Sequence, residues 1–190
     1  MVQAKPRPQT FDDYLSHCQD KDARYELTNG ELIEIPPESD ENVIIARAMD
    51  RALSELVGFR RVRSHQLALE MPGQPKNRFP DITVLLPEHV EQLKASGQSA
   101  IRLDMHPPML VVEVVSPGAD NHRRDYIDKR NQYEWRGIPE YWIVDPIKQQ
   151  VTVLSMTTDG YGETVFVGDE LVLSQSFTDW PLTAAEMLSP

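Results

Sequence analysis

Apolar residues recur along the chain with two different spacings, which predict helices in some windows and strands in others. In residues 40–57 they return every three or four positions, as they do on one face of a helix. The expected helices cover residues 10–19, 40–57, 88–96 and, starting at 120 or 121, the stretch to 136. Gly58 and Gly137 follow the two long ones, which is typical of a helix C-terminus.

Strands are expected where apolar and polar residues alternate or where short apolar runs occur. Residues 24–35 predict a β-hairpin, because Asn29-Gly30 is a strong signal for a two-residue turn. The most apolar run, residues 109–115, predicts a buried central strand. Further strands are expected at residues 61–71, 79–86, 140–144, 151–154, 164–167 and 170–173. This order of elements predicts an α/β fold, with a mixed β-sheet flanked by helices and an N-terminal β-hairpin.

The length of 190 residues fits one domain spanning residues 1–190, with residues 1–9 and 188–190 as loose ends. No window is apolar enough to cross a bilayer, and the first ten residues lack the apolar stretch of a signal peptide. Cys18 is the only cysteine, so an intrachain disulfide is impossible. These features predict a cytoplasmic protein without a membrane partner.

The charge balance argues against tight nonspecific binding to DNA. The chain carries a net charge of −11, and phosphate repels a globally acidic surface. Basic residues gather locally in three groups, and solvated surface charge is the simplest interpretation of each. The groups are Arg60, Arg61 and Arg63; Lys76 and Arg78; and His122, Arg123, Arg124, Lys129 and Arg130. A local nuclease site remains compatible with the net charge.

Two acidic residues interrupt apolar strands. Asp81 lies in the run of residues 79–86, and Glu113 lies in the central strand of residues 109–115. An ionised carboxylate loses its hydration in such a position, so each needs a reason to be there. Either one alone could pair with an arginine or cap a loop. Two acids that meet at one strand end could instead share a divalent cation, which offsets their mutual repulsion.

The hairpin offers a third acid. With a two-residue turn, Glu26 pairs with Ile33 across the strands, and the two side chains share a face. If that face looks inward, Glu26 is a site candidate, and Glu31 lies on the same face nearer the turn. In the alternative arrangement the other face, which carries Leu27, is buried.

The second long helix supplies a cation. Asp125, Lys129 and Tyr133 are four residues apart, so they form one stripe along the helix. Asp125 and Lys129 could be an ordinary pair on the helix surface. The functional alternative is that Lys129 points toward Glu113.

Other kinds of chemistry find little support. The five histidines show no metal-ligand spacing, so a zinc site is not expected. Ser116 lies outside any nucleophile-elbow motif, and there is no glycine-rich phosphate loop. We expect Trp135, Tyr141 and Trp142 to belong to the core.

Four motifs, in this order, resemble the Uma2-type (DUF820) family of restriction endonucleases within the PD-(D/E)XK nuclease superfamily. They are Pro80-Asp81, the run from Glu113 to Pro117, the Asp125, Lys129 and Tyr133 stripe, and the run from Gly137 to Pro146. The hairpin from Arg24 to Leu32 resembles the opening of the same family. The resemblance extends from about residue 10 to residue 187.

The resemblance implies a restriction-endonuclease-like core with a mixed four-stranded sheet. It implies Mg²⁺, for which Mn²⁺ could substitute, held by Asp81 and Glu113 with the Val114 backbone carbonyl as a possible third ligand. Glu26 would be the auxiliary acid. Two departures stand out. Val115 occupies the usual lysine position, so Lys129 would supply the amine from the next helix, and Asn42 stands where relatives often carry a histidine.

The expected function is Mg²⁺-dependent hydrolysis of DNA phosphodiester bonds, with Glu26, Asp81, Glu113 and Lys129 as the catalytic residues. The alternatives are a nuclease-fold module that binds DNA or protein without cleavage, and a protein–protein adaptor. Because cutting both strands of a duplex usually requires two sites, a homodimer is expected.

Overall fold

A computed structural model of the chain describes residues 8–18 and 23–190. The helices are α1 Phe11–Cys18, α2 Asp40–Val57, the 3₁₀ turn η1 Phe59–Arg61, α3 Pro87–Ser96, α4 Ala119–Arg123, the π-helical segment η2 Arg124–Lys129, α5 Arg130–Arg136 and α6 Ala184–Leu188. The strands are β1 Tyr25–Thr28, β2 Glu31–Glu34, β3 Val62–Ser64, β4 Ala68–Glu70, β5 Asn77–Arg78, β6 Ile82–Val84, β7 Ala100–Ile101, β8 Leu110–Val114, β9 Glu140–Asp145, β10 Gln150–Thr157 and β11 Gly160–Val167.

A six-stranded sheet forms the centre of the molecule, in the order β11-β10-β9-β8-β6-β3. Only β8 and β9 run parallel, and the other neighbours in this sheet are antiparallel. The sheet is therefore mixed, as the sequence predicts, and it has two strands more than the expected four. The run that was expected to be central is β8, which is buried over its whole length.

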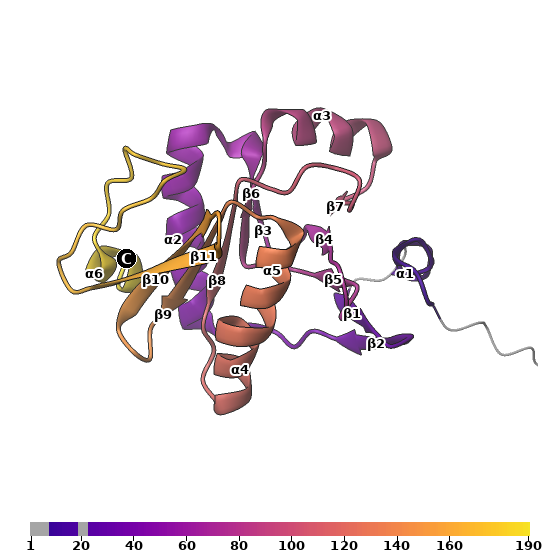
Figure 1. Cartoon of the computed structure of the whole chain (residues 1–190), viewed down its shortest axis with the longest axis horizontal. Coiled ribbons are helices and arrows are strands. Elements are labelled where there is room, and N and C mark those ends of the chain that lie inside the picture. Colours follow the sequence, from indigo (N-terminus) through magenta and orange to yellow (C-terminus); the bar gives the residue numbers. More distant parts are fainter. Residues whose placement is uncertain (1–7, 19–22) are drawn as a thin grey trace, which may run out of the picture.

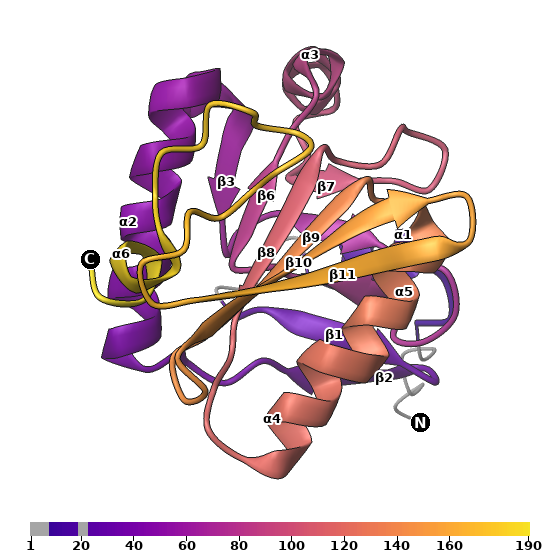
Figure 2. The same cartoon turned by 60° about the vertical axis from the view of Figure 1, so that its left-hand side comes forward.

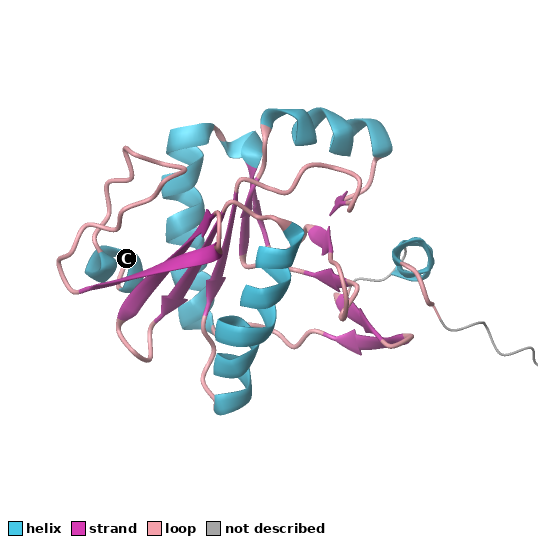
Figure 3. Ribbon diagram, viewed as in Figure 1, coloured by secondary structure: helices cyan, strands magenta, loops and turns pink. Residues whose placement is uncertain are grey.

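Helices cover both faces of this sheet (Figures 1 and 2). On one side α2 packs against β3, β6 and β8, and α6 packs against β9 and β10. On the other side α4, η2 and α5 form a continuous helical ribbon from Ala119 to Arg136 (Figure 3). The hairpin of β1 and β2 and the small sheet of β5, β4 and β7 lie on this second side, next to α1 (Figure 1).

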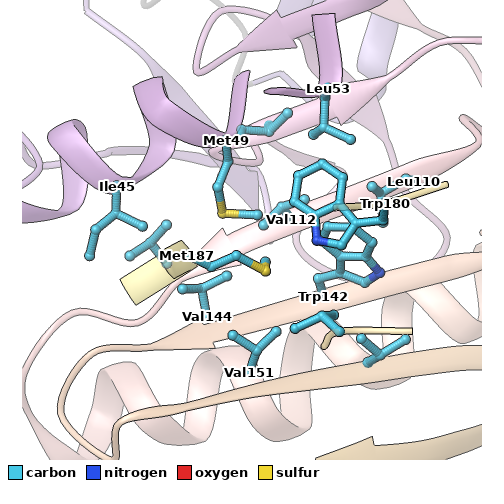
Figure 4. Packing of buried hydrophobic residues seen from close by; sticks show 14 of the residues in the cluster. Ile45, Met49, Leu53, Leu110, Val112, Trp142, Val144, Val151, Trp180 and Met187 are labelled. Carbon is cyan, nitrogen blue, oxygen red and sulfur yellow. The ribbon is translucent and has the colours of Figure 1, made fainter. Parts of the chain in front are cut away.

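The α2 side of the sheet is an apolar core. Ile45, Met49 and Leu53 repeat at helical spacing on α2 and meet Val112 and Trp142 from the sheet (Figure 4). Trp180 from the C-terminal tail packs edge-on against Trp142, with ring centroids 5.0 Å apart. The C-terminal tail therefore packs against the body of the protein. Leu188 is buried, so of the expected loose end only Ser189 and Pro190 are exposed.

The hairpin turn and α2 form as predicted. Asn29 and Gly30 have φ angles of 50° and 79°, the positive values that a two-residue hairpin turn needs at both positions. Glu26 pairs with Ile33, which confirms the register. Helix α2 covers residues 40–57 and ends at Gly58 as predicted, and Ser39 caps its start by accepting a hydrogen bond from the Asn42 amide.

Several predictions of elements and burial are wrong. Residues 61–71 form two strands, β3 and β4, in different sheets, and His65, with φ of 53°, lies in the break between them. Residues 170–173 make only an isolated bridge, Leu171 to Thr183. Trp135 is 70% exposed, because the helical stripe that faces the sheet is that of Tyr133. Within the described part of the chain, no helix has the length and apolarity needed to span a membrane.

Candidate active site

Two neighbouring strands present the two acids that interrupt apolar runs. Ile82 of β6 pairs with Val112 of β8, so the same register places Asp81 opposite Glu113. Side chains of a cross-strand pair lie on one face of a sheet. Val111, Glu113 and Val115 are spaced two residues apart, so their side chains lie on the same face of the sheet. Val111 and Val115 pack with Tyr133 of α5, so this face is the one covered by α4, η2 and α5. Both carboxyl groups are buried, Asp81 to 5% exposure and Glu113 to 2%.

Asp81 is held from two sides. Its Oδ2 accepts a hydrogen bond of 2.6 Å from the backbone amide of Val114. Nδ1 of His65 lies 3.2 Å from Oδ1, close enough for an ion pair although the directions do not suit a well-formed hydrogen bond. The close approach of the Asp81 carboxylate raises the pKa of His65, and burial opposes this shift. The backbone amide of His65 also donates to the Asp81 carbonyl, so the two residues are joined twice.

Glu113 lies against the buried stripe of the helical ribbon. The Lys129 amine is 2.8 Å from Oε2 of Glu113 and also 2.8 Å from Oδ1 of Asp125. The Tyr133 hydroxyl donates to Oε1 of Glu113 at 2.5 Å. Asp125 and Tyr133 are fully buried and Lys129 is nearly so, which rules out the surface-pair interpretation of Asp125 and Lys129. Lys129 belongs to the π-helical segment, a departure from α-helix that is frequent at functional sites.

Burial and mutual repulsion set the electrostatics of this cluster. Burial raises the pKa of Glu113 to about 7; the Lys129 ammonium opposes the shift, and the charges of Asp81 and Asp125 add to it. Burial alone would lower the pKa of Lys129, but the carboxylates of Glu113 and Asp125 outweigh it and raise the pKa. Lys129 is therefore charged at neutral pH, whereas Glu113 is on the edge of protonation.

Glu26 lies outside this direct contact network. Its carboxylate forms an ion pair with buried Arg78, at 3.0 Å, and Nε of Arg78 donates to the Gln132 side chain. Of the two hairpin arrangements that the sequence left open, the structure has the one in which the face of Leu27 is inward: Leu27 is fully buried, and Ile33 is 50% exposed. Glu26 still reaches the helix that carries Lys129, because Arg78 bridges it to Gln132, the neighbour of Tyr133. Glu31, the other acid considered, is exposed near the turn.

The Val114 carbonyl, the third oxygen named by the sequence analysis, faces Asn42. The side-chain amide nitrogen of Asn42 lies 3.3 Å from that carbonyl and 3.0 Å from the Ser116 hydroxyl, and Asn42 is buried. The Ser116 hydroxyl in turn donates to Glu38. The position that departs from the family pattern thus contacts the backbone at the end of β8.

The donor chemistry of this cluster fits a hard divalent cation. Two carboxylates share a face and one, Glu113, has its pKa raised by burial and by its neighbours, so a cation there would relieve an unfavourable charge. Mg²⁺ is commonly bound through one or two carboxylates while it keeps several waters. Among residues 8–18 and 23–190, no three His, Cys, Asp or Glu side chains gather closely enough to enclose a metal by themselves.

Sequence reasoning missed His65. The spacing of the histidines matches no metal motif, so none of them was a candidate site residue. No local pattern shows that His65 lies beside Asp81. That contact arises only when β3 pairs with β6, Ser64 opposite Ile82. Asn42 was noted only as a departure from a family pattern, and its contact with Val114 spans 72 positions in the sequence.

The mixed sheet, its flanking helices and the cluster of two acids and an amine define an α/β domain of the restriction-endonuclease-like class. The crystal structure of a putative nuclease belonging to DUF820 from Anabaena variabilis ATCC 29413 has the same fold, with a TM-score of 0.67 over 96% of this chain and 98% of that chain. The two sequences are 19% identical.

A family model identifies the chain more closely. The model of the Uma2 family, described as "Putative restriction endonuclease", matches residues 11–185. The chain belongs to the Uma2 family, which confirms the resemblance found in the sequence. A search of curated proteins found no match.

Proposed function

We propose that this protein is a Mg²⁺-dependent endonuclease that hydrolyses the phosphodiester bonds of DNA, with Mn²⁺ able to replace Mg²⁺. Asp81 and Glu113 would hold the ion, with the Val114 carbonyl as a further oxygen ligand. Lys129 would be the catalytic cation. The observation that carries the proposal is the buried contact of 2.8 Å between Lys129 and Glu113, on the strand next to Asp81. Membership of a family of restriction endonucleases supports it.

A bound ion would lower the pKa of a water molecule and neutralise negative charge on the phosphate oxygens. The protein's own contribution is to hold the groups around it in place. The Val114 amide fixes Asp81, and the Tyr133 hydroxyl fixes Glu113. These contacts restrict each carboxylate to one orientation before substrate arrives, which is the condition for electrostatic catalysis without reorganisation.

Lys129 has three N–H donors, and Glu113 and Asp125 engage two of them. The remaining donor is available to orient the attacking water or to stabilise the charge that builds on the phosphate. Since the two carboxylates raise the pKa of Lys129, the amine remains a donor throughout the neutral pH range. We assign Glu26 a supporting role, in which Arg78 and Gln132 connect it to the helix that carries Lys129.

Plasmid cleavage tests this assignment. Wild type should nick or linearise plasmid DNA in Mg²⁺ or Mn²⁺ and not in EDTA, and Asp81→Asn should reduce the rate about 100-fold or more. Asparagine keeps an acceptor for the Val114 amide, so the fold should persist. Asp128→Asn, an isosteric change at an exposed position on the same helical ribbon, is the matched control and should cleave like wild type. Equal activity of wild type and Asp81→Asn would end the assignment.

Metal binding is measured without substrate. Titration calorimetry should detect Mn²⁺ binding to wild type and a loss of affinity of at least about tenfold in Asp81→Asn. Asp128→Asn should bind as wild type does. Binding of Mn²⁺ that is unchanged in Asp81→Asn would place the ion elsewhere.

A second candidate function has an observation of its own. Both oxygens of Glu113 already hold a donor, Lys129 on one and Tyr133 on the other. This arrangement favours a nuclease fold that binds DNA or protein without cutting. Fluorescence anisotropy with labelled duplex separates the two: binding without any metal-dependent cleavage supports the non-catalytic module.

We also expect a homodimer in the cytoplasm, since two sites are needed to cut both strands of a duplex. Analytical ultracentrifugation at micromolar concentration tests the assembly. Sedimentation as a 21.7 kDa monomer, with or without DNA, would contradict it.

A further inference from the structure

A basic hollow lies between η1, β3 and α3, on the side of β3 away from the rest of the sheet. Its volume is about 450 Å³, and its lining includes three basic side chains, Arg60, Arg63 and Lys94, with Glu91 as the one acid. Arg60 and Lys94 are exposed. A concave surface with excess positive charge is unexpected on a chain with a net charge of −11. It attracts anions locally, whereas the chain as a whole repels them.

The structure separates three arginines that are neighbours in the sequence. Arg61 is partly buried, and its Nε donates to the Leu85 carbonyl at 2.8 Å, so it ties η1 to the end of β6. Arg63 donates to the Arg60 and Val62 carbonyls, which fixes its guanidinium at the wall of the hollow. Arg60 keeps its guanidinium at the surface. The interpretation as solvated surface charge suits Arg60, which is exposed, but not Arg61 and Arg63, which are partly buried and hydrogen-bonded to the backbone.

An exposed aromatic ring adjoins the hollow. Phe59 is 75% exposed, and the Arg60 guanidinium lies 6.0 Å from the centre of its ring. Single exposed apolar side chains are common on proteins and carry no argument alone. Here the ring stands beside a cation that lines a basic hollow. Aromatic rings next to basic grooves are the elements with which proteins bind single-stranded nucleic acid, because each base can stack and each phosphate can pair.

The hollow is connected to the candidate active site through the pairing of β3 with β6. Arg63 pairs with Thr83 across β3 and β6, and Asp81 is two residues from Thr83, so these side chains lie on one face of the sheet. On the other side of the hollow, the Ser99 hydroxyl donates to the Gln66 carbonyl, and Gln66 follows His65, the neighbour of Asp81. The hollow and the candidate active site are therefore connected through the same pair of strands.

We propose that the hollow of Arg60, Arg63 and Lys94 binds a backbone phosphate of a single-stranded nucleic-acid segment, and that Phe59 stacks on a base of that segment. A paired duplex does not offer a base face for stacking, so the ligand is an unpaired tail, flap or gap. The role of this segment as a flank of the cleaved bond rests on the proposed nuclease function; the binding itself does not.

Charge removal tests the phosphate contact. Affinity is measured by fluorescence anisotropy in EDTA, with a labelled single-stranded oligonucleotide, across a series of salt concentrations. Arg60→Ala combined with Lys94→Ala should weaken binding at least about tenfold and reduce the slope of log affinity against log salt by roughly 1 to 2. Arg47→Ala combined with Arg51→Ala removes two exposed arginines from α2 and is the matched control. Equal losses in the two double variants would overturn the proposal.

Removal of the ring tests the stacking contact. Phe59→Ala should weaken binding of the single strand about tenfold, with the salt slope unchanged, because stacking involves no counterion release. Its effect on a blunt duplex of the same length should be less than about twofold. Trp135→Ala removes another exposed aromatic ring and should leave both affinities as in wild type. A Phe59→Ala variant that binds the single strand like wild type would contradict the stacking proposal.

The two proposals can fail separately. If plasmid cleavage depends on Asp81 but the hollow variants bind like their controls, the nuclease function stands and the hollow is not a binding site. If single-strand binding is lost in the hollow variants but no metal-dependent cleavage occurs, the hollow stands and the nuclease function falls. If wild type binds no single strand in EDTA at low salt, the inference about the hollow is wrong whatever the cleavage result.

Discussion

The two faces of strand β8 differ in kind, although they belong to the same five residues. Toward α2 the strand presents Val112 and Val114, which pack with Trp142 in an apolar core. Toward the helical ribbon it presents Val111 and Glu113, and Glu113 meets Lys129 among further apolar residues. Burial of the first face stabilises the fold directly, whereas the second face also carries the desolvation cost of ionised groups.

Buried ionisable groups make the face toward the helical ribbon less stabilising than the apolar face. Glu113, Asp125 and Lys129 are each nearly or fully buried, and the second oxygen of Asp125 has no hydrogen-bond partner in the described chain. A set of apolar side chains of the same volume would avoid these costs. Perturbed ionisable groups cluster at functional sites, which is why we propose a catalytic role for these residues. The α2 face, by contrast, is explained by packing.

The largest change should come from the apolar face. Trp142→Ala removes a fully buried ring that touches Trp180, with a cost of about 3–5 kcal/mol of unfolding free energy from lost burial and the cavity left behind. Urea unfolding followed by circular dichroism measures it. Trp135→Ala, at an exposed position, should change the free energy by less than about 0.5 kcal/mol. Comparable losses in the two variants would mean that the core is not where we describe it.

The second-largest expected loss of stability comes from removing the cation on the charged face of β8. Lys129→Met keeps an apolar side chain of nearly the same length but removes the ammonium group. Asp125 still has Arg124 at 3.2 Å, whereas Glu113 stays buried without a cation in contact, which should cost about 3 kcal/mol of unfolding free energy. The double variant with Glu113→Gln should recover part of that loss, because one uncompensated carboxylate is gone. Lys94→Met, on the exposed side of α3, is the control and should unfold like wild type. A Lys129→Met protein as stable as wild type would show that the pair is not a buried one.

Most of the fold follows from the sequence, because local patterns carry it. The boundaries of α2 are fixed by Ser39 as N-cap and Gly58 as C-cap, both of which are local signals. The break at His65 was missed, since the apolar alternation over residues 67–71 predicts one strand together with the residues before it, and only pairing with two different partners separates β3 from β4. The sequence could not decide which face of the hairpin is buried, because each face carries apolar residues.

The candidate site was half predictable. Asp81 and Glu113 stand out because each is an acid in an apolar run, and Lys129 belongs to a stripe that is visible at helical spacing. What brings them together is the register between β6 and β8 and the packing of the helical ribbon on that face, which are long-range facts. The contacts of His65 and Asn42 depend on the same facts, so no local pattern reveals them.

The third effect is a dependence on pH. Unfolded Glu113 has its ordinary pKa of 4.5, and in the folded protein burial raises that pKa to about 7. Between these values the folded state holds a proton that the unfolded state has lost, so stability falls as pH rises from 4.5 through 7. Between pH 5 and pH 7.5 the metal-free protein should lose roughly 2 kcal/mol of unfolding free energy through this group.

Glu113→Gln has no carboxyl group to titrate, so its unfolding free energy should fall much less over the same range. The raised pKa of His65 acts in the same direction in both proteins, so the difference between them isolates Glu113. Glu163→Gln, at an exposed position on β11, should follow the wild-type curve. Parallel curves for wild type and Glu113→Gln would remove the argument that burial strains this carboxylate.

The smallest expected effect comes from Asn42, which contacts the end of β8, where the two faces of the strand meet. Asn42 reaches from α2, the apolar side, to the Val114 carbonyl and the Ser116 hydroxyl. Asn42→Ala leaves both groups without the amide, which should cost about 1 kcal/mol of unfolding free energy, the net value of a hydrogen bond. Asn131→Ala, at an exposed position on α5, should cost less than about 0.5 kcal/mol.

Mn²⁺ affinity of the Asn42→Ala variant decides what the amide does. If Asn42 serves only to anchor α2 to β8, the affinity should remain within about threefold of wild type, because the carbonyl has a second lone pair for an ion. If the amide instead positions the carbonyl as a ligand, the affinity should fall by at least about tenfold, the usual size of an indirect contribution to a metal site. We expect the second result, since Asn42 is buried against the same residue whose amide fixes Asp81.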